Sequence, residues 1–327
     1  MLKLVFVNRY SMFWHFLKNN KIVCMSHLKI AVIQAAPVLF DLEQSLQKTY
    51  DLMAKAAEKE AELVVFPESF LPAYPRGLSF GSVVGSRTEA GRDVWKLYWQ
   101  NSVEVPGEAT QKLGNWAKKF GVYLVMGITE RDTINGSLYC SLVYFSPEGT
   151  LLGKHRKLKP TAAERIIWGE GDGADLGVYK TPFGKLGGLI CWENYMPLAR
   201  TALYDQGVQI YVAPTADARD TWQATMQHIA LEGRCFVIGC NQFVTKPMYP
   251  PEILALAEMQ SQPEIMSRGG SVVISPLGKV LAGPLFDREE IMTVSLDTDE
   301  VIRAKLDFDP IGHYSRPDVF ELTKPSP

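Results

Sequence analysis

One cysteine lies where an apolar run gives way to polar residues, in the segment LGGLICWENYMPLAR (residues 186–200). The run before Cys191 predicts a short buried strand, and residues 194–200 predict the start of a helix. A thiolate is a strong nucleophile, and the unpaired N–H groups at a helix N-terminus lower the pKa of a nearby thiol. The position would suit Cys191 as a nucleophile, but a lone cysteine of this kind is more often a small buried core residue, and the segment alone does not decide between the two.

Two other segments place ionisable side chains at the ends of predicted strands. Glu68 follows the apolar run ELVVFP, where a carboxylate could act as a general base or cap a neighbouring backbone group. The segment GKHRKLKP (153–160) contains Lys154, Lys157 and Lys159. A lysine beside a thiolate would stabilise both the thiolate and an anionic intermediate, whereas a basic cluster is more often a solvated surface.

The surrounding pattern alternates strands with helices. Predicted strands cover residues 28–37, 62–68, 122–131, 208–214, 235–243 and 290–297, predicted helices cover 42–61, 107–121 and 219–234, and strand–turn–strand units cover 135–158 and 270–283. A long loop rich in Gly, Pro and Ser is expected over 69–92. Hairpins mixed with β–α–β units indicate mixed sheets covered by helices.

Composition excludes several classes of function. The 327 residues are 46% hydrophobic with a formal net charge of −2, so nothing favours a nucleic-acid partner. The five cysteines form no CxxC pair and the histidines are scattered, which predicts free thiols in the cytoplasm and no metal site. No apolar run reaches the roughly 18 residues that a membrane span needs.

The chain is expected to form a single domain over residues 26–327, preceded by an N-terminal extension over 1–25. Charged and polar residues interrupt every apolar run in the extension, so it does not resemble a signal peptide. Translation could instead start at Met25, directly before the first predicted strand.

Glu68 in FPES, Lys157 in HRKLKPT and Cys191 in CWENYMPLAR follow one another in an order that resembles the Glu–Lys–Cys triad of the nitrilase superfamily. The resemblance extends from about residue 28 to 320 and includes KPTAAERIIWGEGDG and HIALEGRCFV. These motifs are similar to the nitrilase branch rather than to the amidase and carbamoylase branches. The resemblance implies an α/β fold, a four-layer αββα sandwich in which two mixed β-sheets pack face to face with helices outside.

The resemblance also implies hydrolysis of an organic nitrile to the carboxylic acid and ammonia, without a cofactor. Cys191 would attack the nitrile carbon and form a thioimidate and then a thioester. Glu68 would be the general base, and Lys157 would hold the developing negative charge. Glu164 matches a second family glutamate that supports the lysine.

The same resemblance gives expectations for the substrate pocket and for the oligomeric state. Tyr74, Trp168 and Trp192 are candidate aromatic walls of a narrow pocket, each of which could equally be core or interface. His228 matches a nitrilase position near the active site, although a histidine on an apolar helix face is more often a core residue. A homodimer or higher homo-oligomer is expected, and because the chain ends soon after residue 320, without the long family tail, a short oligomer is favoured over a filament.

Three alternatives remain open at this point. The same triad acts on a carbonyl in amidases and carbamoylases, and a cyanide-hydrating enzyme would use similar chemistry. A catalytically silent binding or scaffold protein could keep the fold, because fold does not imply function.

Overall fold

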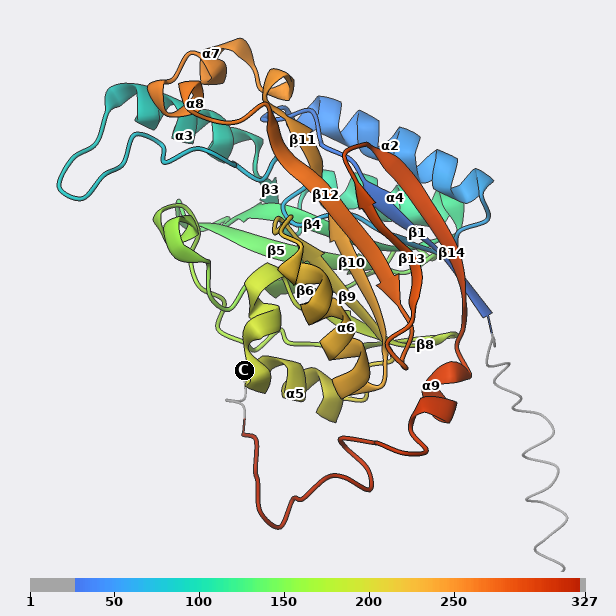
Figure 1. Ribbon diagram of the computed structural model, residues 1–327. Helices are drawn as coiled ribbons and strands as arrows, with labels where there is room; N and C mark the ends of the chain where they lie inside the picture. Colours follow the sequence, from blue (N-terminus) through green and yellow to red (C-terminus); the bar gives the residue numbers. More distant parts are fainter. Residues whose placement is uncertain (1–26, 324–327) are drawn as a thin grey trace, which may run out of the picture.

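The computed structural model describes residues 27–323, and the expected extension over 1–25 lies outside them. The described chain contains two seven-stranded sheets (Figure 1). The first has the order β14-β1-β2-β4-β5-β6, with β3 beside β4, and the second has the order β11-β12-β10-β9-β8-β7, with β13 beside β12. Both sheets mix parallel pairs, such as β1 with β2 and β9 with β10, and antiparallel pairs, such as β4 with β5 and β10 with β12.

The elements have the following bounds. Strands of the first sheet are β1 (His27–Gln34), β2 (Leu63–Val65), β3 (Val103–Glu104), β4 (Tyr123–Arg131), β5 (Leu138–Phe145), β6 (Leu151–Arg156) and β14 (Glu290–Asp297). Strands of the second sheet are β7 (Tyr179–Thr181), β8 (Gly184–Gly188), β9 (Ile210–Thr215), β10 (Phe236–Asn241), β11 (Phe243–Thr245), β12 (Ile265–Ile274) and β13 (Val280–Phe286). The α-helices are α2 (Leu42–Glu58), α3 (Glu89–Asn101), α4 (Glu108–Phe120), α5 (Pro197–Asp205), α6 (Thr221–Gly233), α7 (Pro251–Leu254), α8 (Ala257–Gln260) and α9 (Glu300–Ala304), and the 3₁₀ turns are η1 (Ala162–Ile166), η2 (Cys191–Tyr195) and η3 (Lys246–Met248).

Alternation along the strands sorts the apolar side chains into three cores. In β1, Ile30 and Val32 pack between the two sheets with residues of β9 and β10, while Ala31 and Ile33 face outward and pack under α2 and α4. A third cluster joins the outer face of the second sheet to α5 and α6. Since successive side chains of a strand point to opposite faces, both sheets are covered on both sides. The four-layer αββα sandwich expected from the sequence is confirmed.

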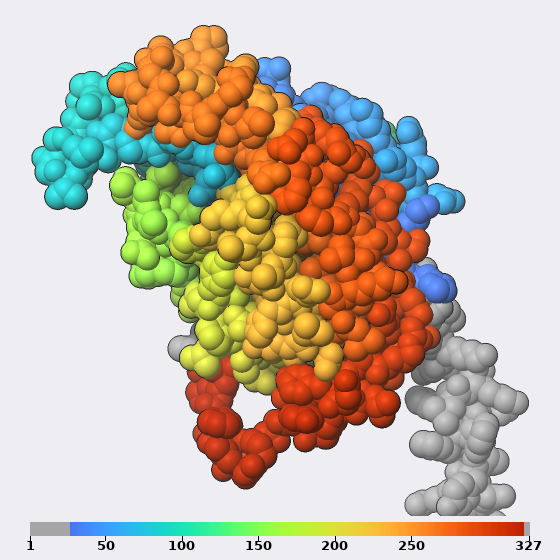
Figure 2. All heavy atoms as spheres, viewed as in Figure 1, coloured from blue at the N-terminus to red at the C-terminus, as the bar shows by residue number. Residues whose placement is uncertain are grey.

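Most predicted elements are confirmed, and the main omission is α3. The sequence indicates a loop over 69–92, but the helix begins at Glu89, where the Thr88 hydroxyl caps it by accepting a hydrogen bond from the Gly91 N–H (3.1 Å). Figure 2 shows that the segment containing α7 and α8 (orange) packs on the segment that leads into α3 (cyan). The Glu258 carboxylate accepts a hydrogen bond from the Ser79 N–H (3.0 Å) in this contact. Within residues 27–323, no helix is long and apolar enough to cross a membrane.

A glycine on β4 makes room for the segment that carries Glu68. After β2, this segment runs along β4, with the Leu71 N–H donating to the Gly127 carbonyl oxygen (3.2 Å). A Cβ atom at Gly127 would lie 2.0 Å from the Pro67 carbonyl oxygen and 2.8 Å from the Glu68 Cα. Both contacts are with backbone, so no side-chain rotation can relieve them.

We therefore expect Gly127→Ala to lower the free energy of unfolding by about 1–3 kcal/mol, the usual cost of forcing an extra methyl group into a packed interior. Because the clash lies at Glu68, catalytic activity should fall as well. Gly136→Ala is the matched control, since a Cβ there meets open space. Denaturant unfolding curves that coincide for the two variants would contradict this packing.

Candidate active site

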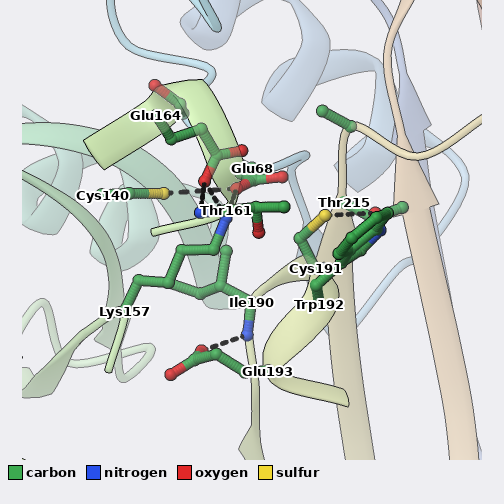
Figure 3. Close-up of polar contacts among 12 residues, drawn as sticks. Glu68, Cys140, Lys157, Thr161, Glu164, Ile190, Cys191, Trp192, Glu193 and Thr215 are labelled. Atoms are coloured by element: carbon green, nitrogen blue, oxygen red, sulfur yellow. Dashed lines mark hydrogen bonds and ion pairs between the residues drawn. The ribbon is translucent and has the colours of Figure 1, made fainter. Parts of the chain in front are cut away.

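A fully buried ammonium group lies between two carboxylates. The Nζ atom of Lys157 is 2.7 Å from Oε1 of Glu68 and 2.8 Å from Oε2 of Glu164 (Figure 3). Lys157 and Glu68 are 0% exposed, and Glu164 is 8% exposed. The other two lysines of the basic segment lie nearer the surface, where Lys154 pairs with Glu130 and Lys159 with Glu170. The structure thus brings together Glu68, Lys157 and Glu164, which the sequence analysis singled out.

Backbone and side-chain hydrogen bonds fix the positions of Lys157 and Glu164. Lys157 directly follows β6, and its N–H donates to the Cys140 carbonyl oxygen of β5 (2.8 Å). Glu164 lies in η1, where its Oε2 also accepts a hydrogen bond from the Thr161 N–H (2.7 Å), as in a capping box. Its Oε1 accepts the hydroxyl proton of Tyr74 (2.7 Å). Both carboxylate oxygens of Glu164 are therefore fixed.

Cys191 lies at a sharp bend after the second sheet's β8. The strand ends at Gly188, and Cys191 begins the 3₁₀ turn η2 with a left-handed backbone (φ 50°) that non-glycine residues rarely adopt. The Asn194 side-chain amide holds the bend by donating to the carbonyl oxygens of Leu189 (3.1 Å) and Cys191 (2.8 Å). Such strain costs about 1–3 kcal/mol and persists where the surroundings over-determine it.

A further buried carboxylate, that of Glu193, links this bend to the strand end that carries Lys157. Glu193 accepts hydrogen bonds from the N–H groups of Ile190 (2.7 Å) and Leu158 (2.6 Å), the residues next to Cys191 and Lys157. It also pairs with Nε2 of His155 (3.0 Å), whose Nδ1 is 3.0 Å from Asp175. Glu193 therefore fixes Cys191 and Lys157 relative to each other.

The electrostatics correct one expectation from the sequence. The predicted helix N-terminus does not reach Cys191, because α5 begins at Pro197. Burial, together with the negative charge of Glu68, raises the pKa of the Cys191 thiol to about 12, although Lys157 opposes the shift. The resting group is therefore a thiol, which needs a base to take its proton.

Glu68 is placed to be that base. Burial raises the pKa of Glu68 above its ordinary value, while the Lys157 charge opposes the rise. Burial alone would lower the pKa of Lys157, but Glu68 and the other nearby acidic groups raise it well above its ordinary value. Oε2 of Glu68 is buried without a hydrogen-bond partner among the described residues, so it is available to accept a proton.

A cavity of about 710 Å³ opens above Cys191. Its lining includes Cys191, Glu164 and Thr161, and two of the predicted aromatic walls, Tyr74 and Trp192. Trp168 does not line this cavity but packs edge-on behind Tyr74, with ring centroids 5.7 Å apart. The structure does not bring His228 to the cavity, because its side chain is 64% exposed on α6 and faces Glu232.

Several residues of the site were not predicted from the sequence. The Thr215 hydroxyl, at the end of β9, donates to the Cys191 sulfur (3.2 Å), and Cys140 Sγ lies 3.5 Å from Oε1 of Glu68. No spacing signal marks Thr215, which lies 24 residues from Cys191. Glu193 had a signal, since it lies two residues after the cysteine. Within residues 27–323, no group of three or more His, Cys, Asp or Glu side chains is placed to hold a metal ion.

Comparison with known proteins shows the family to which this chain belongs. Residues 29–306 match the carbon–nitrogen hydrolase family. An aliphatic nitrilase of Sinorhizobium fredii (strain HH103) is 49% identical over 298 residues, covering 91% of this chain and 96% of that protein. Nitrilase 2 of Arabidopsis thaliana is 49% identical over 308 residues (93% and 90%), and a bifunctional nitrilase/nitrile hydratase of Nicotiana tabacum is 49% identical over 298 residues (90% and 85%).

Solved structures with lower identity share the fold. A carbon–nitrogen hydrolase from Helicobacter pylori G27 has a TM-score of 0.69 at 22% identity, covering 90% of this chain and 97% of that one. An amidase from Nesterenkonia sp. has a TM-score of 0.62 at 21% identity, covering 86% and 94%.

The Glu193 contacts predict a positioning role. In Glu193→Gln, one oxygen becomes an NH₂ group that cannot accept from an N–H, so one charged hydrogen bond is replaced by a clash between donors. We expect kcat to fall about tenfold to a hundredfold with little change in KM, because the cavity walls are untouched. Glu170→Gln, at an exposed glutamate paired with Lys159, is the control. A rise in KM as large as the fall in kcat would argue against a positioning role. So would a variant in which neither constant changes.

His155 predicts a pH-dependent contribution to stability. Burial alone would lower its pKa, but Glu193 and Asp175 raise the pKa from its ordinary 6.5 to about 10. A raised pKa means that the charged imidazole stabilises the fold fully below pH 6.5 and that this contribution is lost as the pH rises through 10. The difference in unfolding free energy between the wild type and His155→Gln should therefore shrink between pH 6.5 and 10. A difference that grows over this range would be inconsistent with the assignment.

Proposed function

Since the chain belongs to the carbon–nitrogen hydrolase family, we propose that it is a nitrilase, which hydrolyses an organic nitrile to the carboxylic acid and ammonia. The observation that carries this proposal is the buried Glu68–Lys157–Glu164 cluster beside a thiol that opens onto a cavity. The nitrilases at 49% identity over more than nine-tenths of the chain support a nitrile as the substrate.

In the first half-reaction, Cys191 Sγ bonds to the nitrile carbon and one π bond of the nitrile breaks. Glu68 takes the thiol proton, which is then delivered to the nitrile nitrogen to give a thioimidate. Lys157 stabilises the negative charge that develops on the nitrogen, and a fixed cation in a dry site does this more strongly than water would. The Thr215 hydroxyl, 3.2 Å from the sulfur, stabilises the thiolate as it forms.

In the second half-reaction, Glu68 takes a proton from water, and the hydroxide adds to the thioimidate carbon. Glu68 returns its proton to the nitrogen. As the carbon–nitrogen bond breaks, the proton of the added hydroxyl group also moves to the nitrogen, so ammonia leaves and the thioester carbonyl forms. A second water, activated in the same way, releases the carboxylic acid and restores the thiol. The group with a raised pKa thus serves alternately as base and acid.

The tetrahedral intermediate can also break its carbon–sulfur bond, which releases the amide. A tenfold change in this partition corresponds to only about 1.4 kcal/mol. The Nicotiana tabacum relative is named a bifunctional nitrilase/nitrile hydratase. Both acid and amide therefore need to be measured as products.

We also propose a cytoplasmic homo-oligomer. Cys140, Cys191, Cys235 and Cys240 are free buried thiols, as expected in a reducing compartment. Leu198 on α5 and Leu231 on α6 are 68% and 41% exposed, and both belong to the helix layer outside the second sheet. Association of two copies through this layer would cover these side chains.

Ammonia release tests the activity on phenylacetonitrile, benzonitrile, fumaronitrile, a short aliphatic nitrile, cyanide and the matching amides. We expect nitrile turnover in the wild type, none in Cys191→Ala, and a loss of at least about a hundredfold in kcat for Glu68→Gln, the usual range for removing a general base. Lys157→Gln should lose activity similarly, whereas Lys159→Gln, its matched surface control, should not.

Circular dichroism of each variant separates lost chemistry from lost folding. Turnover of amides alone would contradict the proposal and indicate an amidase. If the folded wild type released no ammonia from any of these compounds, a binding or scaffold protein would be favoured.

A further inference from the structure

The cavity above Cys191 is lined by three arginines, of which two already have carboxylate partners. The Nε atom of Arg219 is 2.9 Å from Oδ1 of Asp217. Arg268 lies 3.3 Å from Asp220 and 3.7 Å from Asp287. Among residues 27–323, no carboxylate lies within ion-pair distance of the third arginine, Arg76.

Arg76 is fixed in place nonetheless. Its Nη2 donates to the Ala216 carbonyl oxygen, and its guanidinium lies 5.3 Å from the centre of the Tyr74 ring. The Tyr249 hydroxyl donates to its carbonyl oxygen (2.9 Å), which ties the loop to the segment before α7. A guanidinium has five N–H donors in a planar fork, so one bond to a carbonyl leaves most of them for another acceptor.

The backbone group that binds this cation is next in sequence to a residue that contacts the nucleophile. Ala216 follows Thr215, whose hydroxyl contacts the Cys191 sulfur, so the guanidinium binds the backbone one residue from a direct partner of the thiol. Arg76, Ala216 and Cys191 all line the same cavity. A molecule bound to both Arg76 and Cys191 therefore needs only a short chain between its two polar ends.

The charges would also orient such a molecule. Glu68 and Glu164 around Lys157 leave one net negative charge beneath Cys191 when both are ionised. This charge repels an anionic group from the thiol, while Arg76 attracts that group to its own part of the cavity lining. A nitrile is neutral, so it is the end that can approach the sulfur.

We propose that Arg76 is the subsite for a carboxylate on the substrate, and that the preferred nitriles are short ω-cyano carboxylates. The carboxylate accepts N–H groups of the Arg76 guanidinium, and the nitrile carbon lies at Cys191. This inference rests on the nitrilase activity proposed above and specifies its substrate class.

The test uses matched pairs of nitriles that differ only in charge. The pairs are 3-cyanopropanoate with 4-oxopentanenitrile and 4-cyanobutanoate with 5-oxohexanenitrile, in which a methyl group replaces the carboxylate oxygen. Wild-type kcat/KM should be at least about tenfold higher for the carboxylate of at least one pair, as expected for a charge-assisted hydrogen bond.

Arg76→Gln should remove this preference by raising KM for the carboxylate about tenfold to a hundredfold, with kcat/KM for the ketone within about twofold of the wild type. Arg76→Lys should restore part of it, since an ammonium keeps the charge without the planar fork. Lys180→Gln, which removes one exposed positive charge on β7, is the control for net charge and should leave the preference unchanged.

Two results would overturn the subsite while leaving the nitrilase activity intact. One is a wild type that hydrolyses simple nitriles without preferring either carboxylate. The other is an Arg76→Gln variant that loses the same factor on both members of a pair, which would make Arg76 a structural residue of the loop. If the wild type hydrolysed none of the nitriles, the result would instead contradict the proposed function itself.

Discussion

The site depends on one buried ammonium group that needs two carboxylates. An ion-sized charge taken out of water costs several kcal/mol even after relaxation, and the cost is offset only by close, well-placed partners. Lys157 has such partners at 2.7 and 2.8 Å. Glu68 follows β2, Lys157 follows β6 and Glu164 lies in η1. These three segments must therefore meet beyond the carboxyl-terminal ends of β2 and β6. Removing either glutamate leaves the ammonium with a single carboxylate partner.

The nucleophile comes from the other sheet, so the packing of the two sheets determines whether the site forms. Cys191 lies at a strained bend after β8, and the bend is held by Asn194 and Glu193 rather than by its own backbone preference. Glu193 also binds the N–H next to Lys157. The Glu193 carboxylate thus links the positions of the two sheets. The His155 imidazole, which also pairs with Asp175, balances its charge.

Much of this arrangement could be predicted from the sequence, because strand periodicity is a local signal and because the motifs around Glu68, Lys157 and Cys191 resemble those of a known family. The environment of Cys191 could not, since burial outweighs any helix contribution and raises the thiol pKa instead of lowering it. The sequence-based choice of Lys157 over Lys154 and Lys159 agrees with the geometry. His228 was misplaced because its apolar neighbours on α6 face the core while it faces solvent. Thr215 and Asn194 act through tertiary contacts that leave no pattern along the chain.

The central claim is that Cys191, and no other thiol, forms a covalent bond to the nitrile carbon. Acid-quenched mass spectrometry of the wild type during turnover, followed by peptide mapping, tests it most directly. The account predicts an adduct with the mass of the nitrile, or of the corresponding acyl group, on the peptide that contains Cys191. An adduct on Cys140, whose sulfur lies 3.5 Å from Glu68, or nitrile turnover that persists in Cys191→Ala, would contradict it.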